Sequence, residues 1–179
     1  MSGSQMDSIQ QQAEAGCAAL IDSQATLSLA TVASDGRADI SYAPFVRDGQ
    51  GRFCIFVSAL AAHTGNLLRE PAASVMLIQP ESEASNLFAR ERLTLRCCAE
   101  EVQRGTVDYE SILQQMQARF GPLIAQLRGL GDFHLLALVP QSGTYVMGFG
   151  RAYELDVHSG ELRHIDADRL RQRLAGEAD

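Results

Sequence analysis

The sequence lacks the features that are typical of zinc-binding, nucleic-acid-binding and membrane-spanning proteins. Its four cysteines include no CxxC pair, so no zinc site is expected and we interpret them as small buried hydrophobic residues. No tract of basic residues occurs, and the formal net charge of -7 argues against sequence-independent binding to nucleic acid, which needs clustered cations. No apolar run approaches the ~20 residues that span a bilayer.

The N-terminus also lacks a secretory signal. The first residues, MSGSQMDSIQQQ, are polar and contain neither the cationic stretch nor the apolar run of such a signal, so we expect a cytoplasmic protein. The chain of 179 residues is 46% hydrophobic and 21% charged, which is typical of a globular protein with a real core. With no repeat, linker or composition break, we predict one domain over residues 1–179. It would comprise an N-terminal helix in 1–24, a barrel core in 26–155 and a tail in 156–179.

Hydrophobic periodicity predicts an α+β protein. Strands are expected at residues 26–32, 38–45, 52–58, 72–78, 90–104, 133–140 and 143–155, with the continuous run at 72–78 interpreted as buried on both faces. Helices are expected at residues 5–22, 107–120 and 123–129, with partly helical structure at 80–89. The tail predicts a short strand and then a helix from Asp166 or Asp168. Turn-type connections without βαβ alternation favour a six- to seven-stranded antiparallel barrel with peripheral helices.

The segment 57–71, VSALAAHTGNLLREP, is the first candidate site. An apolar strand stops at Ser58, a loop of small residues carries His63 and Thr64, and a short helix follows and ends at Pro71. A loop at a helix N-terminus favours anions, because backbone N–H groups and the helix dipole point toward it. The alternative is that Thr64 only caps the helix and His63 is a solvated loop residue.

The other histidines leave several interpretations open. His134 lies in an apolar strand and is expected to face outward or to be a hydrogen-bonded core residue, whereas His158 follows a strand and fits a turn. His164 is close to Asp166 and Asp168, and a neighbouring carboxylate is what a metal-ligating imidazole usually has. The alternative for His164 is a surface residue.

Asp132 is the candidate acid. It follows the Gly-Leu-Gly run at 129–131 and directly precedes an apolar strand. Such a carboxylate is either a turn or cap residue, or a buried acid aimed at a partner group across an interface. No Ser-His-Asp or paired-glutamate motif can be singled out, so hydrolase chemistry has no support.

Several stretches, taken in order, carry a resemblance to a known family. They are TLSLATVASDGRADISYAPF, FCIFVSALAAHTGNLLREP, ASVMLI, FARERLTL, QARFG, GDFHLLAL and VMGFGRAY. Together they resemble haem-utilisation proteins of the HutZ/HugZ type, within the flavin split-barrel superfamily typified by pyridoxamine phosphate oxidase. The resemblance runs from about Thr26 to Tyr153 without large gaps.

The resemblance implies a split-barrel homodimer that binds haem between its two protomers. In some members dioxygen and an external electron donor open the haem ring, so that haem is both cofactor and substrate. The resemblance further implies that a C-terminal His ligates the iron and that an Asp of the other subunit hydrogen-bonds that His. It makes Asp132 the expected acid, and His164, or alternatively His158, the expected ligand. The resemblance also makes three arginines candidates for holding the haem propionates, namely Arg90, Arg92 and Arg163.

The resemblance implies FMN as an alternative cofactor. Flavin-using split barrels commonly place an Arg-Lys pair after the strand that ends at Ser58, whereas this chain has His63 and Thr64 there. The loss of two cations should weaken phosphate binding, although Ser58, Thr64 and the helix N-terminus remain to receive a phosphate. The two alternatives to a haem-degrading dimer are therefore an FMN-dependent oxidoreductase and a non-catalytic haem- or flavin-binding module.

Overall fold

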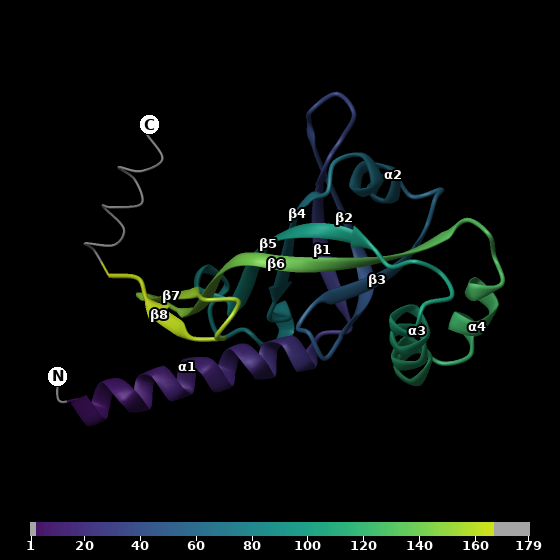
Figure 1. Ribbon diagram of the computed structural model, residues 1–179. Coiled ribbons are helices and arrows are strands. Elements are labelled where there is room, and N and C mark those ends of the chain that lie inside the picture. Colours follow the sequence, from purple (N-terminus) through teal and green to yellow (C-terminus); the bar gives the residue numbers. More distant parts are fainter. Residues whose placement is uncertain (1–2, 167–179) are drawn as a thin grey trace. The chain divides into compact units, whose positions relative to one another are not determined.

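A computed structural model of the chain describes residues 3–166. These residues divide into two compact units. One unit, the barrel unit, contains residues 24–77 and 95–141. The other, the terminal unit, contains the described parts of Met1–Ser23, Ile78–Thr94 and Ser142–Asp179. Figure 1 labels the helices and strands of both units, and each unit is described by itself.

The strands follow the order β3-β2-β1-β4-β5-β6-β7-β8, and β3 also pairs with β6. This extra antiparallel pairing closes the first six strands of that order into a barrel, so that each of the six has a neighbour on both sides. The predicted α+β barrel is thereby confirmed, with β7 and β8 as additional strands. The bounds are β1 (Thr26–Val32), β2 (Ala38–Arg47), β3 (Phe53–Ser58), β4 (Ala72–Ile78), β5 (Arg92–Glu101), β6 (Phe133–Gly148), β7 (Arg151–Leu155) and β8 (Leu162–His164).

The barrel wall follows from the alternation of side chains along each strand. β1 and β2 form the predicted hairpin, in which Val32 pairs with Ala38 and Gly36 takes the positive φ of 81° that the turn requires. Strand β4 occupies the predicted residues, but the prediction that it is buried on both faces is wrong within this chain. Its residues alternate between exposed and buried, because only one face of the barrel wall points into the core.

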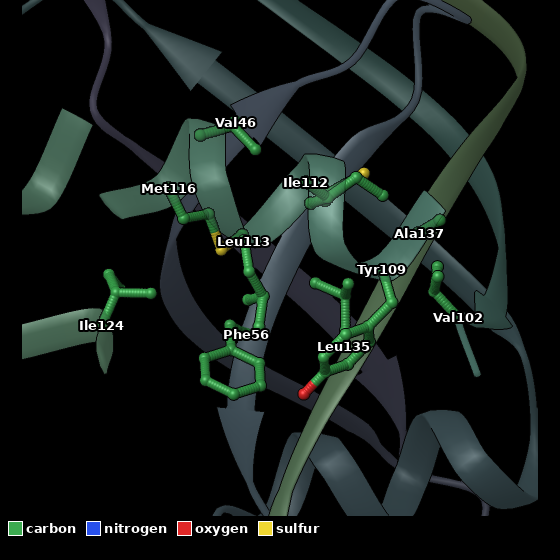
Figure 2. Packing of buried hydrophobic residues seen from close by; sticks show 11 residues of the cluster. Val46, Phe56, Val102, Tyr109, Ile112, Leu113, Met116, Ile124, Leu135 and Ala137 are labelled. Atoms are coloured by element: carbon green, nitrogen blue, oxygen red, sulfur yellow. The ribbon is translucent and has the colours of Figure 1, made fainter. Parts of the chain in front are cut away.

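A second layer of core lies between the barrel and two helices of the same unit. Helix α3 (Val107–Phe120) begins where the Thr106 hydroxyl accepts from the Tyr109 N–H at 3.2 Å, and α4 (Leu123–Arg128) follows it after Gly121. Their apolar faces pack on the strands as Figure 2 shows. The buried cluster consists of Val46, Cys54, Phe56, Val102, Tyr109, Ile112, Leu113, Met116, Ile124, Leu135 and Ala137.

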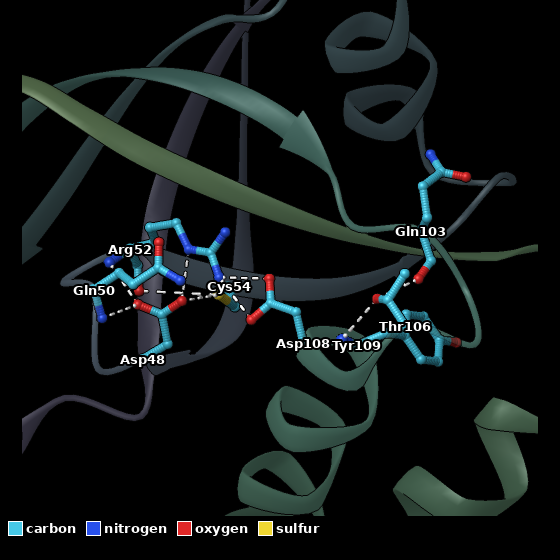
Figure 3. A network of polar contacts seen from close by, with 8 residues as sticks. All are labelled: Asp48, Gln50, Arg52, Cys54, Gln103, Thr106, Asp108 and Tyr109. Carbon is cyan, nitrogen blue, oxygen red and sulfur yellow. Dashed lines mark hydrogen bonds and ion pairs between the residues drawn. The ribbon is translucent and has the colours of Figure 1, made fainter.

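Arg52 joins the β2–β3 turn to the first turn of α3, as Figure 3 shows. Its guanidinium lies 2.6 Å from the Asp48 carboxylate and 2.8 Å from that of Asp108. Burial opposes the charge of Arg52, but its hydrogen bonds with the two carboxylates raise its pKa above the ordinary value. Burial raises the pKa of the neighbouring Cys54 thiol to about 12, so this thiol stays protonated, and it donates to Asp48 Oδ2 at 3.8 Å.

Helix α2 (Ala62–Arg69) begins earlier than the sequence pattern suggests. Its N-cap is Ala61, so His63 and Thr64 lie in the first turn of the helix rather than in a loop. The expectation that Thr64 caps the helix is wrong, because its hydroxyl points back and donates to the Ser58 carbonyl at 2.7 Å. Helix α2 packs on β1 and β2 of the barrel.

The terminal unit contains α1 (Gly3–Ser23), the short 3-10 helices η1 (Glu81–Glu83) and η2 (Leu87–Ala89), the later part of β6, and β7 and β8. The two short helices confirm the partly helical segment. The predicted strand break near residue 142 is wrong: β6 continues to Gly148, because residues 143–148 pair with β7. The chain turns at Gly150, with a positive φ of 66°.

The short strand predicted for the tail is confirmed as β8, whereas the helix predicted from Asp166 or Asp168 lies outside the described residues. Within residues 3–166, no helix combines the length and the apolar character needed to cross a bilayer. Three of the four cysteines are buried and Cys98 is half-buried, as expected for small hydrophobic residues.

Candidate functional site

The barrel unit brings Ser58 and Asp132 together. Ser58 ends β3 and pairs in register with Phe133, the first residue of β6, so Asp132 lies beside it although 74 positions separate the two residues in sequence. The Ser58 hydroxyl donates to Asp132 Oδ2 at 2.6 Å, and the Ala59 N–H donates to the Asp132 carbonyl at 2.7 Å. The carboxylate is therefore held by its neighbour across the strand pair. Both side chains are half-buried.

Thr64 supports this arrangement from the first turn of α2. Its side chain is wholly buried, and its hydroxyl donates to the Ser58 carbonyl. Two residues further along, the buried Asn66 amide donates to Thr31 Oγ1 at 3.0 Å and to Asp39 Oδ2 at 3.1 Å. These bonds hold α2 against the barrel. The Thr64 hydroxyl therefore has a structural role within the chain.

His63 lies on the same helix turn and is half-buried. Its Nδ1 lies 3.0 Å from Ser41 Oγ, and its Nε2 is a buried nitrogen without a hydrogen-bond partner among the described residues. Burial lowers the pKa of His63, against a smaller opposing effect of the Asp39 charge. The ring is therefore mainly neutral at pH 7 and does not replace the positive charge of a lysine or arginine.

His134 lies on β6 two residues after Asp132. Its Nδ1 is 2.7 Å from Glu101 Oε1 and its side chain is 27% exposed. His134 is therefore a partly outward, hydrogen-bonded histidine and not a core residue. Arg104 donates to the carbonyls of Leu130 and Phe133 at 3.3 and 3.1 Å. These two bonds hold the segment that leads into β6 and carries Asp132.

The predicted iron ligands lie in the terminal unit. His164 is exposed at the end of β8, its Nε2 lies 3.1 Å from the Gly150 carbonyl oxygen, and its ring meets the Tyr153 ring edge-on at 5.3 Å between centroids. His158 is exposed in the turn after β7, where its backbone N–H donates to Asp156 Oδ1 at 3.0 Å. The hydrogen bond to Gly150 fixes the orientation of the His164 ring.

The three arginines predicted to hold propionates each have contacts within the terminal unit. The Arg90 Nε–H donates to the Gln79 carbonyl at 2.9 Å, and Arg92 donates to the Arg90 carbonyl at 3.0 Å. Arg163 is exposed and lies 2.9 Å from Glu161. Arg163 is the arginine of the three that is most open to solvent.

Sequence reasoning missed the contacts that orient the candidate residues. Ser41, Glu101 and Gly150 are the partners of His63, His134 and His164, and each lies on another strand or turn. Tertiary contacts bring these pairs together, with His63 placed by the packing of α2 on β2, so no local motif signals them. Among residues 3–166, no group of three or more His, Cys, Asp or Glu side chains is placed to hold a metal ion.

The closed six-stranded antiparallel barrel with peripheral helices has the architecture of the split-barrel class. The pyridoxamine 5'-phosphate oxidase family matches residues 13–147, and the chain belongs to this family. HutZ of Vibrio cholerae serotype O1, named a heme oxygenase, is 45% identical over 130 residues, which cover 73% of each chain. The resemblance to the HutZ type is thereby confirmed.

Solved structures agree with this assignment. The crystal structure of HutZ, described as the heme storage protein from Vibrio cholerae, is similar with a TM-score of 0.69 at 39% identity, and the match covers 73% of this chain and 92% of HutZ. The structure of ChuZ from Campylobacter jejuni is similar with a TM-score of 0.78 at 29% identity, covering 88% of this chain and 64% of ChuZ.

Proposed function

We propose that this protein binds haem in a site shared by two copies of the chain, and that it opens the haem ring when dioxygen and an external electron donor are supplied. The similarity to HutZ, 45% identical over 130 residues, carries the proposal. HutZ is described both as a heme oxygenase and as a heme storage protein. Binding is therefore the first step to test, and turnover is the second.

His164 would be the residue that binds the haem iron. An imidazole that binds iron presents the lone pair of one nitrogen while the other nitrogen donates to an acceptor. The His164 ring is exposed and one of its nitrogens is within hydrogen-bond distance of the Gly150 carbonyl, so the other is available. His158 lacks such a ring contact among the described residues, and this difference favours His164.

Asp132 is the proposed acceptor for the ligand imidazole of the second copy. The Ser58 hydroxyl bonds Oδ2, so Oδ1 remains to accept an imidazole N–H. In the assembled site Asp132 would replace the Gly150 carbonyl as the hydrogen-bond acceptor of His164. A carboxylate acceptor makes the imidazole a stronger donor to iron, and partners of this kind typically change metal affinity or activity by ~10- to 100-fold. The bound haem would supply the redox-active iron at which dioxygen is reduced.

A hemin titration of the purified protein tests the proposal. The wild-type protein is expected to give a saturable Soret band, His164→Ala to lose it, and His158→Ala, the matched control from the same hairpin, to keep it. Loss in His158→Ala with retention in His164→Ala would transfer the ligand role to His158. A wild-type protein that gives no Soret band would contradict haem binding. Loss of the Soret band under reductant and oxygen, with release of iron, would distinguish degradation from storage.

A second candidate function is an FMN-dependent oxidoreductase, which the family match over residues 13–147 favours. It predicts a yellow purified protein that releases flavin on denaturation. It also predicts that FMN binding does not respond to His164→Ala. The same titration carried out with FMN in place of hemin therefore separates the two candidates.

A further inference from the structure

A carboxylate, that of Asp132 before β6, lies against the loop between β3 and α2. Asp132 Oδ2 accepts the Ser58 hydroxyl proton at 2.6 Å, and the Asp132 carbonyl accepts the Ala59 N–H at 2.7 Å. These two bonds place a carboxylate at the loop where flavin-binding relatives would need to receive a phosphate. Both bonds lie within the barrel unit and join the end of β3 to the start of β6.

The side-chain donors of this loop are used inside the chain. Ser58 donates to Asp132, and its oxygen also accepts the Leu60 N–H at 3.1 Å. The Thr64 hydroxyl is wholly buried and donates to the Ser58 carbonyl. Neither hydroxyl can donate to an incoming phosphate unless it gives up its present partner.

The cations of the neighbourhood do not compensate for the Asp132 charge. His63 has its Nδ1 on Ser41, and burial lowers its pKa, so the ring is mainly neutral at pH 7. Arg69 ends the same helix, and its guanidinium donates to the Val32 carbonyl at 2.6 Å and to Asn66 Oδ1 at 3.4 Å. A phosphate is bound by cations and by free hydrogen-bond donors. This loop instead has a negative carboxylate beside it, and its Ser58 and Thr64 hydroxyls already donate to partners within the chain.

We propose that the Ser58–Asp132 pair makes this loop reject the phosphate of FMN, so that the chain discriminates against phosphate-bearing ligands at the site that its fold family uses for them. Like charges a few ångströms apart at a protein surface lower an affinity roughly 5- to 100-fold. Discrimination against FMN would then come both from repulsion by the Asp132 carboxylate and from the lack of cations that attract the phosphate. The inference goes beyond the proposed haem function, because it concerns the exclusion of FMN and holds whether or not the chain binds haem. It argues against the second candidate function, an FMN-dependent oxidoreductase.

The test compares FMN with riboflavin, which differ by the phosphate alone. Binding is measured by flavin fluorescence quenching for the wild type, for Asp132→Asn, which keeps the shape and removes the charge, and for Glu101→Gln. Glu101 is a matched control because it also is a carboxylate bonded to a side chain of the barrel unit, that of His134. The wild type is expected to bind FMN no more tightly than riboflavin. Asp132→Asn is expected to gain at least about fivefold in FMN affinity with riboflavin unchanged.

The controls decide how each outcome is read. Glu101→Gln is expected to leave both flavin affinities unchanged, and added salt is expected to reduce the difference between wild type and Asp132→Asn. A wild-type protein that prefers FMN over riboflavin would overturn the inference, even if Asp132→Asn did not fold. It would also be overturned if folded Asp132→Asn failed to gain FMN affinity, or gained equally for both flavins. Hemin titrations of the same variants report separately on the proposed function.

Discussion

Gly16 is the residue at which the structure makes the sharpest stability prediction. It lies in α1, where alanine is intrinsically the better helix former by about 1 kcal/mol. A Cβ at this position, however, would lie 2.5 Å from the Tyr145 hydroxyl oxygen and 3.3 Å from Glu91 Oε1. Tyr145 is fully buried and donates to Glu91, and burial together with this bond raises the Tyr145 pKa. Gly16→Ala must therefore displace a buried phenol.

The expected size follows from three contributions. Overpacking of a core contact costs about 1–3 kcal/mol, and weakening a hydrogen bond to a charged group costs about 1.5–3 kcal/mol. The helix propensity of alanine offsets about 1 kcal/mol of this. We expect Gly16→Ala to lower the free energy of unfolding by about 1.5–5 kcal/mol. In a Tyr145→Phe background the clashing oxygen is absent, the ring carbon at 3.6 Å is an ordinary contact, and the same substitution should stabilise by about 0.5–1 kcal/mol.

Urea unfolding followed by circular dichroism, on the wild type, both single variants and the double variant, measures this change of sign. Gly65→Ala in α2 is the matched control, because a Cβ there meets no atom within 4 Å, and it is expected to stabilise by up to about 1 kcal/mol. The reasoning fails if Gly16→Ala stabilises the wild-type protein, or if its effect is the same with and without the Tyr145 hydroxyl.

Three further predictions concern the barrel unit. Arg52→Met should lower the free energy of unfolding by about 3 kcal/mol in urea, because it leaves the Asp48 carboxylate, 6% exposed, without its cation; an effect below about 1 kcal/mol would contradict a structural ion pair. Thr106→Ala should cost about 1 kcal/mol by removing the α3 cap, whereas Thr106→Ser should not. Burial lowers the pKa of His63 below its usual 6.5, so the unfolded chain takes up this proton first and stability falls as the pH drops below about 6.5. His63→Gln should show a smaller fall between pH 7 and 5, and an unchanged pH profile would argue against a neutral ring in the folded state.

The regular elements were predictable where the pattern was local. Strands 26–32 and 72–78 and helix 107–120 agree residue for residue, because their apolar periodicity needs no knowledge of distant segments. The end of β6 was not predictable in this way. Gln141 and Ser142 separate two predicted strands in the sequence pattern, but β6 runs through them as one strand, and from Gly143 onward it pairs with β7.

The candidate site shows the same limit. Ser58 and Asp132 could each be selected as polar residues at strand ends, but their contact depends on the pairing of β3 with β6, which closes the barrel. The start of α2 was placed too late, because Ala61 and Ala62 carry no capping side chain to mark it. The sequence also does not reveal which hydroxyl groups already donate hydrogen bonds within the chain. Thr64 seemed available to a ligand until the fold showed its hydroxyl bonded to the Ser58 carbonyl.

Complementation between two defective chains tests the central claim, a haem site shared by two copies, most directly. Asp132→Asn and His164→Ala chains, carrying different affinity tags, are co-expressed, and the doubly tagged species is isolated and titrated with hemin. If the acid and the imidazole come from different copies, one site in each mixed pair is intact, and about half of the wild-type capacity for tight hemin binding is expected to return. A mixed species that binds hemin no better than the two variants alone, or the absence of any doubly tagged species, would contradict the shared site.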